Sequence, residues 1–205
     1  MKGILMRRYL CLALVATSLL WAAAAVAEEN AAVSKESAKP VRGPDCVYVG
    51  TPYDVIDKML DLAAIGKDDV VYDLGCGDGR IVVAAARRFG CHGVGYDIDP
   101  QRIKEALANI DKNRVEDLVE VKQEDIFTLD LSQTDAVLLY LLPSMNKRLI
   151  PQLMKLKPGS RIVAHNYDIE GIVRDRSVTF RSLEDGVNHY LFVYTAPLEK
   201  ESTKP

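Results

Sequence analysis

The sequence has few of the side chains that hold metal ions or build disulfide frameworks. Its 205 residues include four cysteines and three histidines, and one of the cysteines falls in an N-terminal apolar run. Three cysteines remain, namely Cys46, Cys76 and Cys91. Because their number is odd, they cannot all be paired in a disulfide framework. One disulfide or three inert thiols remain as alternatives. Neither residue type shows the spacing of a metal site, so we expect none.

The sequence also lacks an excess of charge of one sign. Lysine and arginine together number 26 and aspartate and glutamate 29, so the formal net charge is -3. Binding to nucleic acid usually needs a basic face, and we therefore expect no nucleic-acid partner. Hydrophobic residues make up 48% and charged residues 27%, which is ordinary for a globular protein. The length suits one domain with its own core.

One long hydrophobic run is present, at the N-terminus. Basic residues near the start precede an apolar stretch over residues 9–24, and residues 25–27 read Ala-Val-Ala. This order is typical of a secretory signal peptide, which we predict for residues 1–27. An uncleaved anchor is the alternative, and only then do we expect contact with a membrane. Both alternatives predict an exported or periplasmic domain.

The rest of the chain divides into a linker and one domain. Residues 28–45 are rich in Ala, Ser, Lys, Glu and Pro and predict a flexible linker, which leaves residues 46–205 as the domain. In the domain, short apolar stretches alternate with stretches of helical periodicity. The expected helices cover about residues 51–65, 80–89, 100–112 and 145–156, and the expected strands cover about 70–74, 92–97, 119–122, 136–140, 161–165, 178–183 and 189–195.

Strands that alternate with helices predict parallel β-α-β units with right-handed crossovers. Asp185 and Gly186 separate the last two expected strands, which therefore predict a hairpin. The sequence thus predicts an α/β fold. We expect a Rossmann-like, mostly parallel sheet with helices on both faces and an antiparallel C-terminal hairpin.

A glycine-rich turn follows the first expected strand. Residues 75–79 read Gly-Cys-Gly-Asp-Gly, and Asp73 stands two residues before the first glycine. Between a strand and a helix, Gly75, Gly77 and Gly79 let a ligand approach the backbone closely, and the helix start offers free amides. The spacing G-x-G-x-G differs from the G-x-G-x-x-G that cradles a pyrophosphate in dinucleotide-binding proteins.

Acidic residues at this place suit a ligand with positive charge. S-adenosylmethionine (SAM) carries an ammonium group and a cationic sulfur but no phosphate, so Asp73 fits its methionyl end, directly or through water. Asp97 ends the next expected strand, where a carboxylate can accept from both ribose hydroxyls. We prefer it to Asp99 because Asp97 continues the apolar strand. After the third expected strand, Asp125 can accept from the adenine amine and Ile126 can cover the ring.

The order of these motifs resembles that of class I SAM-dependent methyltransferases. The glycine loop at residues 73–79 comes first, then Asp97, then Asp125, and the resemblance extends from residue 48 to about residue 196. It implies a seven-stranded sheet with SAM, the cofactor, lying across the carboxyl ends of the strands.

Three segments carry a closer resemblance. Residues 48–52 read Tyr-Val-Gly-Thr-Pro, residues 73–82 hold the glycine loop, and residues 139–143 read Leu-Tyr-Leu-Leu-Pro. They resemble small bacterial methyltransferases that are similar in turn to mitochondrial protein-lysine methyltransferases. The resemblance implies that Tyr48 and Thr51 border the methionyl end of SAM. It also implies an amine as methyl acceptor, with a protein lysine as the candidate.

The turn after the fourth expected strand usually faces the transferred methyl group. Here Tyr140 could orient an amine or hold a cation against its ring, and Asn146 could hydrogen-bond nearby, so we predict both as catalytic residues. A Tyr140 hydroxyl that points into solvent is the alternative. The turn lacks the Asn-Pro-Pro-aromatic motif of many amino-group methyltransferases, which argues against a nucleobase or a glutamine amide. His165 is either a general base or a hydrogen-bonded core residue.

Two other classes of function remain open at this point. One is a non-catalytic SAM-binding or scaffold protein, because SAM is made in the cytoplasm whereas the leader predicts export. The other is a nicotinamide-dependent oxidoreductase, against which the glycine spacing and the lack of a Tyr-x-x-x-Lys pair both speak. The sequence-based prediction is therefore a SAM-dependent methyltransferase that acts on an amine.

Overall fold

The computed structural model describes residues 42–202. The predicted leader at residues 1–27 and most of the predicted linker at residues 28–45 lie outside this range. The compact unit begins at Arg42, so the last residues of the predicted linker belong to it. Within residues 42–202, no helix is both long enough and apolar enough to cross a membrane.

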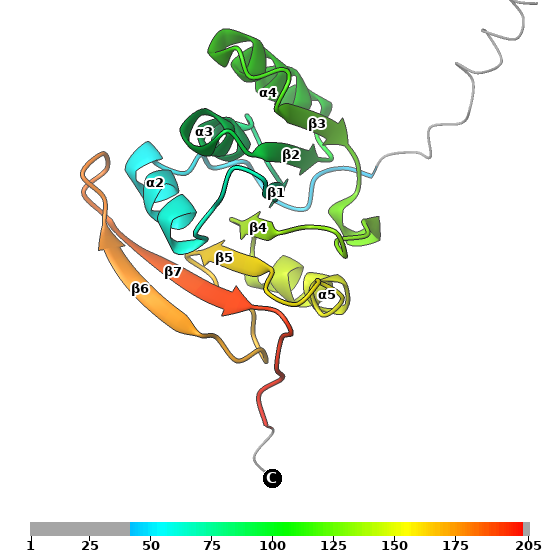
Figure 1. Cartoon of the computed structure of the whole chain (residues 1–205), viewed down its shortest axis with the longest axis vertical. Helices are drawn as coiled ribbons and strands as arrows, with labels where there is room; N and C mark the ends of the chain where they lie inside the picture. Colours follow the sequence, from blue (N-terminus) through cyan, green and yellow to red (C-terminus); the bar gives the residue numbers. More distant parts are fainter. Residues whose placement is uncertain (1–41, 203–205) are drawn as a thin grey trace, which may run out of the picture. The chain divides into compact units, whose positions relative to one another are not determined.

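Helices and strands alternate through the first five strands, and two further strands complete the unit (Figure 1). The helices are α2 (Tyr53–Leu62), α3 (Arg80–Phe89), α4 (Pro100–Asn113), the short 3-10 helix η1 (Ile126–Thr128) and α5 (Pro143–Leu153). The strands are β1 (Val70–Leu74), β2 (His92–Asp97), β3 (Val119–Gln123), β4 (Ala136–Leu139), β5 (Arg161–His165), β6 (Arg176–Arg181) and β7 (Asn188–Thr195).

The seven strands form one sheet in the order β3-β2-β1-β4-β5-β7-β6. Neighbours among β1 to β5 are parallel, whereas β7 runs antiparallel to both β5 and β6. The predicted mostly parallel sheet with an antiparallel C-terminal hairpin is confirmed. The chain reverses its direction of winding between β1 and β4, and open α/β sheets bind ligands outside the carboxyl ends of strands at such a switch point.

Helices cover both faces of this sheet, and β4 shows why its sequence is apolar throughout. Ala136 and Leu138 belong to the core beneath α2 and α3, whereas Val137 and Leu139 belong to the core beneath α5. Successive side chains of a strand point to opposite faces, so a strand covered on both sides needs an apolar residue at every position. Figure 1 shows α5 apart from α2 and α3, as this division requires.

Two helices begin at other residues than predicted. α2 starts at Tyr53 with Pro52 before it, and the Thr51 hydroxyl does not cap the helix but lies 3.4 Å from Nδ1 of His165. α5 starts at Pro143, two residues earlier than predicted, because proline is well suited to the first turn, where its missing N–H costs no helical hydrogen bond.

Candidate active site

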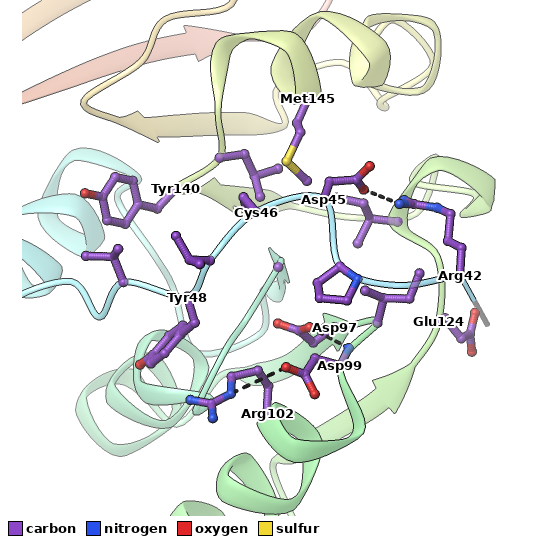
Figure 2. A pocket seen from close by; sticks show the side chains of 17 residues that line it. Arg42, Asp45, Cys46, Tyr48, Asp97, Asp99, Arg102, Glu124, Tyr140 and Met145 are labelled. Atoms are coloured by element: carbon purple, nitrogen blue, oxygen red, sulfur yellow. Dashed lines mark hydrogen bonds and ion pairs between the residues drawn. The ribbon is translucent and has the colours of Figure 1, made fainter.

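A cleft opens at the carboxyl ends of the parallel strands (Figure 2). Its walls come from the loops after β1 to β4, from the starts of α4 and α5, and from a segment that precedes α2. The lining residues are Arg42, Pro44, Asp45, Cys46, Val47, Tyr48, Val49, Gly75, Asp97, Ile98, Asp99, Arg102, Glu124, Ile126, Tyr140, Leu141 and Met145. Of the predicted site residues, Tyr48, Gly75, Asp97, Ile126 and Tyr140 line the cleft.

The segment at residues 42–49, which we call the strap, crosses the cleft in Figure 2. Arg42 anchors it by donating to both carboxylate oxygens of Asp125, at 2.8 and 3.0 Å. Arg148 of α5 donates to Asp45 at 3.3 Å. Sequence reasoning missed the first half of the strap because its polar composition predicts a linker, and nothing local indicates that Asp125 and Arg148 will hold it.

The glycine loop requires glycine for reasons of both backbone and space. Gly75 and Gly77 have positive φ angles of 81° and 56°, which L side chains rarely adopt. A Cβ on Gly77 would lie 2.1 Å from the ring of Tyr48, and one on Gly75 would lie 2.8 Å from Leu141. Gly79, also with positive φ, precedes α3 and packs against Ala106 of α4. The loop thus places backbone without side chains at the cleft wall.

Asp97 connects this loop to the end of β2. Its Oδ2 accepts from the backbone N–H of Gly77 at 2.9 Å, and its Oδ1 accepts from the N–H of Asp99 at 2.9 Å. Asp99 has a different task, because its carboxylate accepts from the N–H of Gln101 and caps α4. A carboxylate offers about four acceptor positions, so Asp97 keeps two free for a ligand that enters the cleft.

Asp73 is the most unusual carboxyl group of the site. It is 1% exposed, and within residues 42–202 its Oδ2 atom has no hydrogen-bond partner. Burial, together with the nearby charges of Asp97 and Asp78, raises the pKa of Asp73 to about 8. An unpaired buried carboxylate is costly, so such a group two residues before Gly75 of the cleft lining indicates a place for a cationic or hydrogen-bonding ligand.

The other predicted residues lie behind the cleft wall. Asp125 is held by Arg42, which lowers its pKa, and its neighbour Glu124 lines the cleft in its place. Asn146 is 1% exposed and donates to the carbonyls of Tyr167 and Asp168, both at 3.1 Å, so it holds the loop after β5.

Thr51 is also buried, and its carbonyl accepts from Arg80 at 3.0 Å. Arg80 pairs with Asp78 through three contacts of 2.7 to 3.1 Å, so it ties Thr51, just after the strap, to the glycine loop. The Tyr140 ring lines the cleft and packs on the imidazole of His165, with 4.0 Å between the ring centroids.

Comparison with known proteins identifies the family of this chain. Residues 73–176, about half of the chain, match the model of the ANTKMT methyltransferase domain. The chain belongs to this methyltransferase family. It is 42% identical over 154 residues to a protein-lysine N-methyltransferase of Saccharolobus islandicus, a match that covers 74% of this chain and 94% of that protein.

A solved structure from Salinibacter ruber, described as an RNA methyltransferase in complex with S-adenosylhomocysteine, is also similar. It shares 44% identity with a TM-score of 0.68, and the match covers 76% of this chain and 98% of that one. The protein is thus a class I SAM-dependent methyltransferase, as predicted, and SAM is its cofactor.

The residues of the cleft fit SAM. Its acidic side chains, Asp45, Asp97, Asp99 and Glu124, outnumber the two arginines, which suits a cofactor that carries a cationic sulfur. The unpaired oxygen of Asp73 suits an ammonium group, directly or through water. The free acceptor positions of Asp97 suit the ribose hydroxyls, and Ile126 offers an apolar surface for the adenine ring.

Replacing Gly77 by alanine is expected to weaken SAM binding by about tenfold or more, which corresponds to about 1.4 kcal/mol. The new Cβ would lie 2.1 Å from the Tyr48 ring, so the ring must move within the cleft. Calorimetry with SAM measures the change. Gly171→Ala is the matched control, because Gly171 also has a positive φ but nothing lies within 4 Å of its added Cβ. Equal effects of the two changes on SAM binding would show that backbone strain, and not the collision, is the cause.

Proposed function

We propose that this methyltransferase transfers the methyl group of SAM to the side-chain nitrogen of a lysine in another protein. The observation that carries the proposal is the pairing of the arginines around the cleft. Within residues 42–202, the two arginines that line the cleft, Arg42 and Arg102, each contact a carboxylate. Arg80 and Arg148, which hold the segment at residues 42–51, are paired in the same way.

This pairing favours a cationic acceptor over an anionic one. Nucleic acids are bound largely by lysine and arginine side chains that neutralise phosphates, and paired arginines are poorly suited to that task. A lysine approaches as a cation, which the acidic lining of the cleft attracts. The exposed part of the Tyr140 ring at the cleft can hold an ammonium group against its face. The name of the Saccharolobus relative supports the same acceptor.

RNA is the second candidate acceptor, because the similar Salinibacter structure is described as an RNA methyltransferase. The formal net charge of -3 and the paired arginines count against it. One labelling experiment with both acceptor classes distinguishes a protein lysine from RNA.

We further propose how the chain's residues divide the work. Asp73 holds the methionyl ammonium, Asp97 the ribose, and Glu124 and Ile126 the adenine, with Tyr48 and Gly75 closing around the methionyl end. SAM supplies a methyl group on a sulfur that leaves readily, so the protein mainly has to align the acceptor nitrogen with the methyl carbon and the sulfur. Tyr140, which borders the cleft after β4, orients the acceptor.

The test uses methyl-tritiated SAM, the full chain and two acceptor pools, a bacterial protein extract and bacterial total RNA. We expect label in the protein pool only, and methyl-lysine after acid hydrolysis. Acetylating the extract beforehand blocks its lysines and should abolish the label. Asp97→Ala is the control for a contaminating enzyme. Label in RNA alone, or on a residue other than lysine, would overturn the proposal.

A further inference from the structure

Four side chains form a continuous chain of polar contacts from beside the cleft to the β6–β7 turn. His165 Nδ1 lies 3.4 Å from the Thr51 hydroxyl oxygen, and His165 Nε2 lies 2.8 Å from His189 Nδ1. His189 Nε2 lies 3.1 Å from Asp185 Oδ2. Thr51, His165 and His189 are buried, whereas the Asp185 side chain is 39% exposed. This row of side chains therefore connects the buried surroundings of the site with solvent.

With both histidines neutral, the Asp185 carboxylate sets the direction of every hydrogen bond in this row. The Asp185 carboxylate can only accept, so His189 carries its hydrogen on Nε2 and has a bare Nδ1. His165 must then donate from Nε2 to that nitrogen, which leaves its own Nδ1 bare. The Thr51 hydroxyl donates to this Nδ1 and keeps its oxygen lone pairs for a further donor. This row of contacts thus ends in a hydroxyl acceptor at its buried end and in a negative charge at its exposed end.

The inner end of the chain lies beside the methyl-transfer region. His165 is the last residue of β5, and its ring packs on Tyr140, which lines the cleft. Thr51 is two residues after Val49 of the strap, which also lines the cleft. The outer end, Asp185, lies in the turn that joins the antiparallel strands β6 and β7.

We propose that Thr51, His165, His189 and Asp185 form a relay that takes the proton from the acceptor ammonium group and passes it to solvent. This inference rests on the proposed function, because a lysine must lose a proton before its nitrogen can attack. Thr51 takes up the proton at the inner end of the relay, His165 and His189 carry it onward, and Asp185 acts as a positioning residue beside His189.

The steps balance in protons and electrons. One proton from the ammonium group reaches Thr51 Oγ as the hydroxyl proton passes to His165 Nδ1. His165 passes its Nε2 proton to His189, and His189 releases one to water beside Asp185. The freed nitrogen lone pair then forms the N–C bond while the C–S pair returns to sulfur, which leaves a methylammonium product and S-adenosylhomocysteine.

The burial of His165 favours a role in transferring a proton over a role as a group that stays protonated. Burial lowers the pKa of His165 to about 3, with a smaller contribution from His189, so its imidazole stays neutral at every working pH. The other titratable groups next to the relay are Tyr140 after β4, Asp54 of α2, which accepts from Ser182, and Glu184, which accepts from the N–H of Asp54.

The experiment compares His189→Gln with the wild type in the labelling assay with the bacterial extract, from pH 7 to pH 9. Loss of a proton acceptor is expected to lower the transfer rate about 100-fold at pH 7. The variant can use only lysine that arrives uncharged, a fraction that rises about tenfold per pH unit below the lysine pKa of about 10.4. Its rate should therefore climb steeply toward pH 9, whereas the wild-type rate should rise much less.

Two further variants keep the test independent of folding. Asp185→Asn removes the charge at the exposed end but can still accept from the Val187 N–H, so the turn should persist and the same pH dependence should appear more weakly. His92→Gln changes the remaining histidine, which is exposed at the start of β2, and should have no effect. SAM affinity should be unchanged in all three variants.

The possible failures can be told apart. An equal rate loss at every pH would assign the histidine chain a purely structural role, and a rate unchanged at pH 7 would also overturn the relay. Wild-type protein that labels no lysine would overturn the proposed function and the relay with it. Wild-type labelling together with a pH-independent loss in the variants overturns the relay alone.

Discussion

Replacing Asp97 by alanine is expected to weaken SAM binding by about 100-fold to 10,000-fold. The change removes a charged acceptor for two ribose hydroxyls, and hydrogen bonds to charged groups contribute about 1.5–3 kcal/mol each. It also removes the acceptor for the N–H groups of Gly77 and Asp99, so the glycine loop loses a tie to the end of β2. Calorimetry with SAM and with S-adenosylhomocysteine on the full chain measures the loss.

Asp99→Ala is the matched control for this result. Asp99 also lines the cleft, but its carboxylate caps α4, and loss of a helix cap costs about 1 kcal/mol of stability. We therefore expect a lower melting temperature with little change in SAM affinity. If Asp99→Ala weakens binding and Asp97→Ala does not, the ribose contact belongs to Asp99.

Replacing Asp73 by asparagine is expected to have two opposite effects. The cofactor-free protein should become more stable at pH 7, because the raised pKa of the buried Asp73 makes its ionised form unfavourable in the folded state. A carboxyl group with a folded pKa above its unfolded value of about 3.9 contributes stability below that pH. This stability is lost as the pH rises toward about 8. Asparagine avoids the loss, which is on the order of 4 kcal/mol at pH 7.

The same substitution should weaken SAM binding and change its proton balance. In the wild type we expect release of nearly one proton at pH 7, because Asp73 must ionise to pair with the methionyl ammonium. Calorimetry in buffers of different ionisation enthalpy measures this release, and denaturant unfolding between pH 5 and pH 8 measures the stability. A wild-type protein that binds SAM without proton release would mean that Asp73 stays protonated or is bridged by water.

Much of the fold could be predicted because its elements rest on local patterns. The apolar residues of β4 predict that this strand is buried on both faces. The Gly-Cys-Gly-Asp-Gly segment after β1 predicts a turn with positive φ angles. The hairpin of β6 and β7 follows from Asp185 and Gly186 in the same way. Helix ends were less certain, since Thr51 has the features of a cap but bonds to His165, a residue far away in the sequence.

The site could be predicted only in part, for a related reason. Asp97 and Gly75 lie at strand ends, and parallel strands bring their carboxyl ends to one edge, so their meeting follows from the order of elements. Asn146 has a polar side chain at the expected place in the sequence, yet it is buried and holds the loop after β5. Periodicity alone did not indicate which way that side chain points.

The sequence by itself determined the sheet, the glycine loop and the identity of the cofactor, because each depends on residues close together in the chain or in register at strand ends. Only the tertiary structure decided that the strap belongs to the cleft, that Arg42 holds Asp125, and that His165 and His189 lie in contact. These pairings join residues distant in sequence, and they arise only when the packed sheet and helices place their side chains within reach of one another.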